Sequence, residues 1–554
     1  MPAPGDLPVN AECVPFRQIP HTTPLFLDYL SHSPSVQKFY PRSPNSAQWL
    51  KEEAGRVQYD PQRRAKASEI LARQNAVWGA SERTLANVER LRRGALAAVT
   101  GQQVGLFGGP LFSIFKALSA VKLAAEATKA GVDCVPIFWL ATEDHDLAEV
   151  NHATLLSAAG PSAGAGRPER LTAESRGVTD APVGTVVFGR EIEAVVERAA
   201  SLLGDSEAAT WLRESYRPGE TLGSGFARLF ARLFAEWGVI LLDPADAEFH
   251  RLAKPLLRAA IERAPELDEA LLARGKALEA AGYHQQVKVT AATTLLFEVR
   301  EGARIAVRRK ANGTGEAGFQ AGHERITERQ LLERVEQAPE NFNPNVLFRP
   351  VVQDYLLPTL AYTGGAAEIA YFAQVGVVYE KLLGRVTPAL PRFSATLVEP
   401  KAERILTRYG LTFPDLFHGP EKVREKMAAR SLPPELQNVF SEAHASVEKA
   451  MTRVRDSVGR LDSTLVAAAD HARMRMWYQI NRLHGRAGRA ELLRNEVIAR
   501  HADAVCDALF PHKALQEREI AGVSFLARYG TSLLANLYDA MHTDCHDHQV
   551  IALK

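Results

Sequence analysis

One stretch of the chain, residues 100–152, constrains the fold most strongly. It begins TGQQVGLFGGPLFSIFK and ends VPIFWLATEDHDLAEVNH. From Leu96–Thr100 onward, an apolar run, the glycine-rich loop Gly101–Pro110, the helical segment Leu111–Ala130 and a second apolar run, Val135–Ala141, follow one another. Runs that are apolar on both faces are typical of parallel strands covered by helices, so this order predicts a β-α-β unit. In such units, ligands bind at the carboxyl ends of the strands.

The same pattern recurs later in the chain. A helical segment at Gly223–Trp237 precedes the buried run Val239–Asp243, and the run Pro358–Tyr362 precedes a helix at Ala366–Leu383. The sequence therefore predicts an α/β fold whose Rossmann-like parallel-sheet core occupies residues 1–400.

Other segments of residues 1–400 do not follow this alternation of apolar runs and helices. Residues 1–60 are rich in Pro and Ser and are expected to be irregular, and 61–93 show one charged helical pattern. Two insertions are predicted, an irregular Ala/Gly/Ser-rich one at about 151–220 and one at about 284–340 with alternating strand patterns around Gly302.

From residue 401 to about 510 the pattern is helical and indicates a coiled-coil domain. Apolar residues follow a 4-3-4-3 spacing at Val447, Met451, Val454, Val458, Leu461, Leu465, Ala468 and Ala472. Gly459 and the pair Asp462–Ser463 are typical of a helix end and a new N-cap, so an antiparallel hairpin is expected. Direct pairing with a second chain is the alternative, and both can hold at once. Residues 511–554 are expected to return to the core.

Composition excludes several classes of protein. The net charge is +1, so no dedicated nucleic-acid binder is indicated. No apolar run approaches the roughly 20 residues of a membrane span, and the first residues lack a secretory signal pattern. The four cysteines are far apart without a CxxC pair, which favours a reducing cytoplasm and no structural disulfide.

The glycine-rich loop is the first candidate ligand site. Glycines allow close backbone approach, and the helix that follows favours an anion at its N-terminus. Neither the Walker A pattern nor GxGxxG is present. The candidate contact residues are Gly101, Gln102, Gln103, Gly105, Gly108, Gly109, Ser113 and Lys116. A tight structural turn with a solvated Lys116 is the alternative.

An acidic cluster around a histidine is the second candidate. This cluster, Thr142-Glu143-Asp144-His145-Asp146, directly follows an apolar run, and Asn151 and His152 lie slightly further on. His145 flanked by carboxylates could act as a general base. A helix start capped by Asp144 or Asp146 is the alternative, and a metal requirement stays open.

Further candidates follow the later strands. Gly364 and Gly365 repeat the strand–glycine–helix pattern, and Glu368 and Tyr371 share one helix face. Arg349 and Arg392 are placed near the same rim and suit carboxylates or phosphates. The tail His542–His548 matches no zinc spacing and is expected to be a polar turn.

Taken together, these motifs resemble the bacillithiol-biosynthesis cysteine-adding enzymes, the BshC family. The resemblance rests on the two segments quoted above, on 343–374 (NPNVLFRPVVQDYLLPTLAYTGGAAEIAYFAQ), on 391–399 (PRFSATLVE) and on 515–519 (LQERE). It implies a Rossmann-like core with insertions, a C-terminal coiled-coil domain and a homodimer. It also implies a ligase that joins L-cysteine to the amine of glucosaminyl-malate in the last step of bacillithiol synthesis.

This implied reaction assigns expected roles to the candidate residues. A carboxylate is a poor electrophile, so activation is required, and ATP is the expected co-substrate. The core is also similar in plan to class I aminoacyl-tRNA synthetases, but HxGH and KMSKS-like segments are absent. The loop and Lys116 would hold anionic oxygens, and His145, oriented by Asp144 or Asp146, would deprotonate the amine or organise the intermediate. Arg349 or Arg392 would bind malate carboxylates. Glu368 and Tyr371 would bind the amine or sugar.

Two other functions are compatible with the sequence. One is a non-catalytic, nucleotide-sensing scaffold whose coiled coil recruits partners. The other is an amino-acid ligase that acts on a different amine acceptor.

Overall fold

The computed structural model describes residues 11–157, 168–174, 178–311, 317–494, 496–542 and 545–554. The chain divides into two compact units. The first comprises Met1–Ala158, Glu169–Ala395 and Glu517–Gln549, and the second comprises Ala159–Pro168, Thr396–Gln516 and Val550–Lys554. No helix in the described part of the chain is long and apolar enough to cross a membrane.

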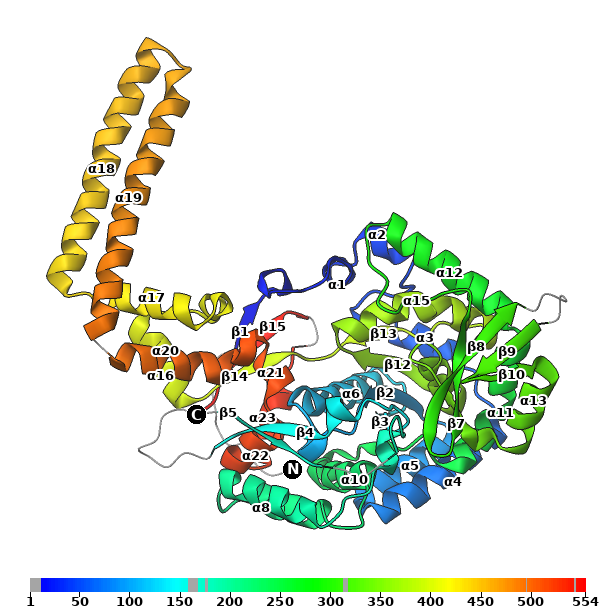
Figure 1. Cartoon of the computed structure of the whole chain (residues 1–554). Coiled ribbons are helices and arrows are strands. Elements are labelled where there is room, and N and C mark those ends of the chain that lie inside the picture. Colours follow the sequence, from blue (N-terminus) through cyan, green and yellow to red (C-terminus); the bar gives the residue numbers. More distant parts are fainter. Residues whose placement is uncertain (1–10, 158–167, 175–177, 312–316, 495, 543–544) are drawn as a thin grey trace. The chain divides into compact units, whose positions relative to one another are not determined.

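A five-stranded sheet lies at the centre of the first unit (Figure 1). Its order is β13 (Ala389–Pro391), β12 (Thr359–Gly364), β2 (Leu96–Gln102), β3 (Cys134–Leu140) and β6 (Ile240–Leu242). Every neighbouring pair is parallel, which confirms the predicted α/β class.

Helices cover both faces of this sheet, as its continuously apolar strands require. On one face, side chains such as Val99 and Ile137 join a core with α4 (Pro61–Val77), α5 (Glu82–Arg93), α11 (Ala247–Glu262) and α15 (Ala366–Leu383). On the other face, Ala98 packs with residues of α3 (Leu50–Arg56) and α6 (Phe112–Lys129). The Phe138 ring lies 5.1 Å from that of Phe230 in α10 (Leu222–Leu233).

Strand register brings the predicted motifs to one edge of the sheet. Thr100 pairs with Thr363 across β2 and β12, and Gln102 pairs with Leu140 across β2 and β3. The segments after β2, β3 and β12 therefore leave the sheet side by side, as expected for neighbouring parallel strands.

The insertion at 284–340 forms the predicted strand pairs. Strands β7 (Thr293–Arg300) and β8 (Ala303–Ala311) are antiparallel, and Gly302 takes a φ of +80° in the turn between them. They belong to a second sheet of order β10-β9-β8-β7-β11, whose other members are β9 (Ala317–Ala321), β10 (Glu324–Thr327) and β11 (Phe342–Pro344).

Two expectations of irregular structure are wrong. The segment 151–220 contains α8 (Glu191–Leu203) and α9 (Glu207–Ser215), because its alanines and leucines form buried apolar faces. It also holds the pair β4 (His152–Leu156) and β5 (Pro168–Thr172), while 158–167 and 175–177 lie outside the described residues.

The first 60 residues include α1 (Pro24–Leu30), α2 (Pro34–Gln37) and α3. The single helical pattern expected at 61–93 is divided into α4 and α5 near Gly79, whose φ is +77°.

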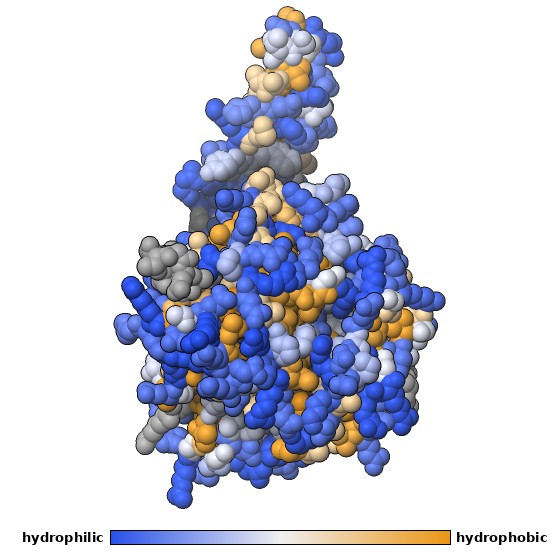
Figure 2. Space-filling model, turned by 90° about the vertical axis from the view of Figure 1, so that its right-hand side faces the viewer, coloured by the Kyte–Doolittle hydropathy of each residue, from blue (hydrophilic) through white to orange (hydrophobic). Residues whose placement is uncertain are grey.

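The second unit is helical and contains the predicted hairpin. Helices α18 (Pro434–Leu461) and α19 (Leu465–Arg494) are its arms, and the Asp462 carboxylate accepts the Thr464 N–H at 2.8 Å in the turn. The remaining long helices are α16 (Pro400–Tyr409), α17 (Pro420–Arg430) and α20 (Glu496–Leu509). Figure 2 shows hydrophobic side chains among hydrophilic ones along the hairpin. Of the predicted apolar seam, Met451 is buried, but Val454 and Leu461 are 45% and 83% exposed.

The four cysteines are free thiols. Cys134 and Cys506 are buried, whereas Cys13 and Cys545, more than 500 residues apart in sequence, have their Sγ atoms 3.5 Å apart. This separation corresponds to a contact between thiols and is too long for a disulfide bond.

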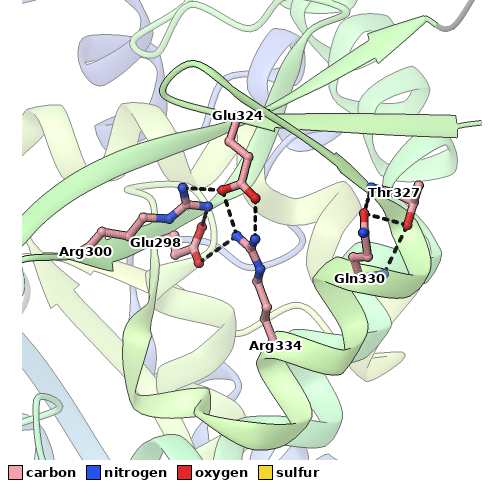
Figure 3. Close-up of polar contacts among 6 residues, drawn as sticks. All are labelled: Glu298, Arg300, Glu324, Thr327, Gln330 and Arg334. Carbon is pink, nitrogen blue, oxygen red and sulfur yellow. Dashed lines mark hydrogen bonds and ion pairs between the residues drawn. The ribbon is translucent and has the colours of Figure 1, made fainter.

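Helix α13 (Glu328–Gln337) begins at a capping box that supplies a first prediction. The Thr327 hydroxyl accepts the Gln330 N–H, and the Gln330 side chain accepts the Thr327 N–H, beside an ion-pair network of Glu298, Arg300, Glu324 and Arg334 (Figure 3). Thr327→Ala is expected to lower the free energy of unfolding by about 1 kcal/mol, because one N–H loses its acceptor. Urea denaturation measures the change. Thr327→Ser retains the hydroxyl and should match wild type, and equal loss in both variants would exclude the cap as the cause.

Candidate active site

A cavity of about 590 Å³ opens in the first unit where β2, β3 and β12 end. Its size is within the range of small-molecule sites. Of the residues singled out from the sequence, it is lined by Gly101, Gln102, Gln103, Lys116, Asp144, His145, Arg349, Gly365, Glu368, Tyr371 and Arg392. Three segments far apart in the chain therefore meet at one site.

Lys116 in α6 lines this cavity and is only 4% exposed. Its Nζ donates to the Gly101 carbonyl at 2.7 Å and to Gln102 Oε1 at 2.8 Å, and pairs with Glu368 Oε2 at 2.5 Å. Burial lowers the pKa of Lys116 to about 8, although Glu368 opposes this shift. Because its three N–H bonds all have protein acceptors, Lys116 organises the cavity wall, and a ligand oxygen would have to displace one acceptor.

Glu368 connects this lysine to the start of α15. Its carboxylate accepts the Tyr362 hydroxyl at 2.5 Å and the Gly365 N–H at 2.8 Å, in a capping box. Burial would raise the pKa of Glu368, but Lys116 and these hydrogen bonds outweigh it and lower the pKa. Glu368 is therefore a carboxylate at neutral pH, facing the cavity.

Arg349, at the start of α14 (Arg349–Leu356), also lines the cavity and lies close to Tyr362. It donates to the Tyr371 hydroxyl at 3.0 Å and to Gln353 Oε1 at 3.1 Å. Its guanidinium carbon is 5.9 Å from the Trp139 ring centroid. No carboxylate among the described residues is paired with it, so Arg349 keeps its charge available to an anion.

His145 lines the cavity beside a residue the sequence did not indicate. Its Nδ1 lies 3.1 Å from Nη1 of Arg304, which comes from β8. The Asp144 carboxylate is 3.6 Å from Nδ1 and instead accepts the His145 backbone N–H at 2.8 Å and the Gln103 amide at 2.7 Å. The atom within hydrogen-bond distance of Nδ1 is thus Arg304 Nη1, while Asp144 lies at ion-pair distance and Asp146 caps a helix instead.

A buried polar layer supports the segment after β3. Glu143 Oε1 is 2.9 Å from His250 Nε2 and accepts the Asn343 amide at 2.5 Å. Thr142 donates to Asp243 at 2.5 Å, and burial raises the pKa of Asp243 to about 6. These contacts fix the backbone that carries Asp144 and His145.

The far part of the glycine-rich loop does not line the cavity. The N–H groups of Gly105, Gly108 and Gly109 donate to Gln103 O, Tyr216 OH and Leu106 O at 3.0, 3.1 and 3.0 Å. The expected anion cradle is not formed there, because these donors are already used within the protein. Gly105 and Gly109 instead allow two parts of the loop backbone to approach each other closely, since a Cβ on Gly105 would be 2.8 Å from Gly109 Cα.

Other predicted residues also lie away from the cavity lining. Asp146 is the N-cap of α7 (Leu147–Val150) and accepts the Glu149 N–H at 3.2 Å, the structural alternative considered above. Asn151 ends that helix and His152 starts β4. Ser113 is fully buried within α6, and Gly364 ends β12. Local structure accounts for these positions, and none of these five residues lines the cavity.

Arg392 reaches the cavity but is neutralised by a distant residue. It makes a bidentate ion pair with Glu517, at 2.6 and 3.2 Å, and the two side chains are 7% and 1% exposed. The expectation that Arg392 binds a substrate carboxylate is therefore not supported, because its charge is already compensated. Ser394 and Ala395 donate to the same carboxylate at 3.0 Å.

His548, beside this ion pair, gives a prediction about pH. It is fully buried at the start of β15 (His548–Ala552), so the expected polar turn is wrong here. Burial lowers the pKa of His548 to about 4, with Glu517 opposing and Arg392 reinforcing the shift. Between its ordinary pKa of 6.5 and about 4, the unfolded chain binds a proton that the folded chain does not. The free energy of unfolding should therefore fall by about 3 kcal/mol as pH decreases through this window.

Urea denaturation of wild type and His548→Asn at about pH 7 and about pH 4.5 measures this contribution. We expect the variant to lose less stability on acidification, because it has no group to titrate at this position. Exposed His323→Asn is the matched control and should behave like wild type. If His548→Asn loses as much free energy of unfolding on acidification as wild type, the acid sensitivity belongs to other groups.

Sequence reasoning missed several cavity residues. Arg304, Tyr362, Phe297 and Arg518 all line the cavity, and so does Glu143, which belongs to the acidic cluster singled out from the sequence. Arg304 belongs to an alternating strand in an insertion, and no local pattern links it to His145. Arg518 is exposed, lies 5.8 Å from the Phe112 ring and has no ion-pair partner among the described residues.

No group of three or more His, Cys, Asp or Glu side chains in the described part of the chain could hold a metal ion. In the tail His542–His548, residues 543–544 lie outside the described part.

Comparison with known proteins covers nearly the whole chain. Residues 9–393 match the model described as bacillithiol biosynthesis BshC, N-terminal Rossmann-like domain, and residues 395–553 match its C-terminal coiled-coil domain. The chain is 50% identical over 540 residues to the putative cysteine ligase BshC of Koribacter versatilis, covering 98% of this chain and 99% of that protein. Proteins of the same name from Solibacter usitatus and Geobacillus thermodenitrificans are 37% and 30% identical, over 98% and 94% of this chain and 100% and 96% of theirs.

Proposed function

The chain belongs to the bacillithiol-biosynthesis BshC family, and on that basis we propose that it is a cytoplasmic cysteine ligase. The proposed reaction joins the carboxyl of L-cysteine to the amine of glucosaminyl-malate, the last step of bacillithiol synthesis. The observation that carries this proposal is the cavity in which Lys116, Glu368, Arg349 and His145 converge. It supplies both charge signs, as a zwitterionic amino acid and an anionic amine acceptor require.

ATP is the proposed co-substrate, because an unactivated carboxylate does not acylate an amine at a useful rate. Arg349 and Arg518 are the cavity cations without a carboxylate partner in the described residues and would hold its phosphates or the malate carboxylates. The cavity of about 590 Å³ also has the aromatic surface of Trp139 and Phe297. When bound, ATP would supply the free energy for activating the cysteine carboxylate.

Glu368 and Tyr371 are proposed to bind the amine or the sugar. Lys116 and the Gly365 N–H engage Glu368 Oε2, whereas Oε1 accepts the Tyr362 hydroxyl and has a second lone pair for an N–H or O–H of the ligand. His145 is proposed to contact the reacting groups, either as a base or as a hydrogen-bonding group.

A homodimer through the coiled-coil domain is proposed as the working assembly. The hairpin of the second unit leaves large apolar side chains exposed, including Leu461 at 83%, Tyr478 at 63% and Met474 at 57%. Burial of such groups against a second copy would be favourable. Light scattering on the purified chain measures its mass. A monomer of 60.7 kDa at all concentrations would exclude the dimer.

Thiol profiling by mass spectrometry tests the reaction. The gene is introduced into a host that accumulates glucosaminyl-malate and lacks its cysteine-adding enzyme, and restored bacillithiol is the expected result. Unchanged glucosaminyl-malate, with soluble protein present, would reject this substrate. A panel of other amine acceptors then separates the two alternative functions. A ligase with a different acceptor would convert one of these amines, whereas a nucleotide-sensing scaffold would convert none.

A further inference from the structure

We propose that Arg304 is a positioning residue that holds the His145 ring in the tautomer with its proton on Nε2. In this state His145 presents a hydrogen-bond donor to the cavity. The tautomer is argued from the geometry alone. The identity of the ligand group that accepts the hydrogen bond from His145 Nε2 rests on the proposed function.

Arg304 is itself held in one orientation. Its side chain is 7% exposed, Nη2 donates to the Pro344 carbonyl at 2.7 Å, and its guanidinium carbon lies 3.9 Å from the Phe297 ring centroid. Its backbone N–H donates to Asp180 O at 2.9 Å. Nη1 is therefore directed at His145 Nδ1, 3.1 Å away, by contacts that do not involve the histidine.

The chemistry of the two groups fixes the direction of this hydrogen bond. A guanidinium has N–H donors and no acceptor, so Nδ1 must accept. A neutral imidazole that accepts at Nδ1 carries its proton at Nε2. Asp144 Oδ1 does not compete, because it is 3.6 Å from Nδ1, beyond the range of a hydrogen bond.

This arrangement is the reverse of one that makes a general base. A carboxylate that accepts from Nδ1 leaves Nε2 free to accept a proton, whereas a cation that donates to Nδ1 places the proton on Nε2. His145 would then donate from Nε2 to an oxygen that gains negative charge, such as the cysteine carboxylate or the oxyanion formed when the amine adds.

Nitrogen NMR of protein labelled at the histidine ring tests the tautomer without any substrate. The His145 signals are assigned by their loss in His145→Gln. We expect an unprotonated Nδ1 and a protonated Nε2 in wild type, and loss of this preference in Arg304→Met, which keeps an apolar stem without the donors. A protonated Nδ1 in wild type, or an Arg304→Met spectrum identical to wild type, would overturn the proposal.

Activity of two amide variants tests the role of the donor. Gln places an N–H near the position of Nε2, whereas Asn places it near Nδ1. We expect His145→Gln to keep activity within about tenfold of wild type and His145→Asn to lose about a hundredfold or more. Equal losses would reject the donor role. If the expected tautomer is found but no bacillithiol forms, the proposed function fails and the role of Arg304 stands.

Discussion

Replacing Glu368 by Gln is expected to lower the free energy of unfolding by about 3 kcal/mol and to abolish cysteine ligation. The substitution removes the charge that faces Lys116 Nζ at 2.5 Å in a site where the two side chains are 4% and 17% exposed. A buried ammonium without its counter-ion is costly, so Lys116 would lose its proton near neutral pH, since its pKa is already lowered to about 8. The cavity would lose both charges of the pair. Urea denaturation and the thiol assay measure the two effects.

Two further variants separate the ion pair from the loss of a side chain. The double variant Lys116→Met, Glu368→Gln has no unpaired charge and should recover most of the lost stability while staying inactive. Glu266 pairs near the surface with Lys381 at 2.6 Å and with Arg263 at 2.8 Å, and both cations stay in contact with water in Glu266→Gln, so this variant should shift the unfolding midpoint far less than Glu368→Gln. If Glu368→Gln is as stable as Glu266→Gln, Lys116 does not depend on Glu368 for its charge.

Gly105→Ala is expected to reduce activity about a hundredfold and stability by about 2 kcal/mol. The new Cβ would lie 2.8 Å from the Gly109 Cα and 3.4 Å from the Gly109 N, so the backbone of the loop must move. Gly105 itself has no contact with the cavity, but Gly101–Gln103 just before it line the cavity and bind Lys116 and Asp144. A shift of the loop therefore displaces catalytic-site groups without removing any of them.

Gly55→Ala in α3 is the matched control for Gly105→Ala. A Cβ at Gly55 has no atom within 4 Å, so this variant should keep full activity and gain up to about 1 kcal/mol from its better helix propensity. Wild-type activity in Gly105→Ala would show that the loop tolerates movement and would remove it from the site.

The sequence by itself determined the features that depend on local patterns. Continuous apolar runs identified β2, β3, β6 and β12, and their alternation with helices required a parallel sheet. Parallel order then placed the motifs after β2, β3 and β12 at one edge, so the meeting of Lys116, His145 and Glu368 could be anticipated. The spacing of apolar residues and the stop near 459–463 determined the hairpin in the same way.

Only the tertiary structure decided which polar groups are available to a ligand. Glu517 neutralises Arg392 across 125 positions, and Arg304 reaches His145 across 159. The glycine-loop N–H groups are taken by acceptors that include Tyr216, 108 positions away. A hydrogen bond or ion pair depends on atoms within a few ångströms, and such pairs leave no periodic trace in the sequence. Residue type therefore predicted what each side chain can do, while long-range packing determined whether it is free to do it.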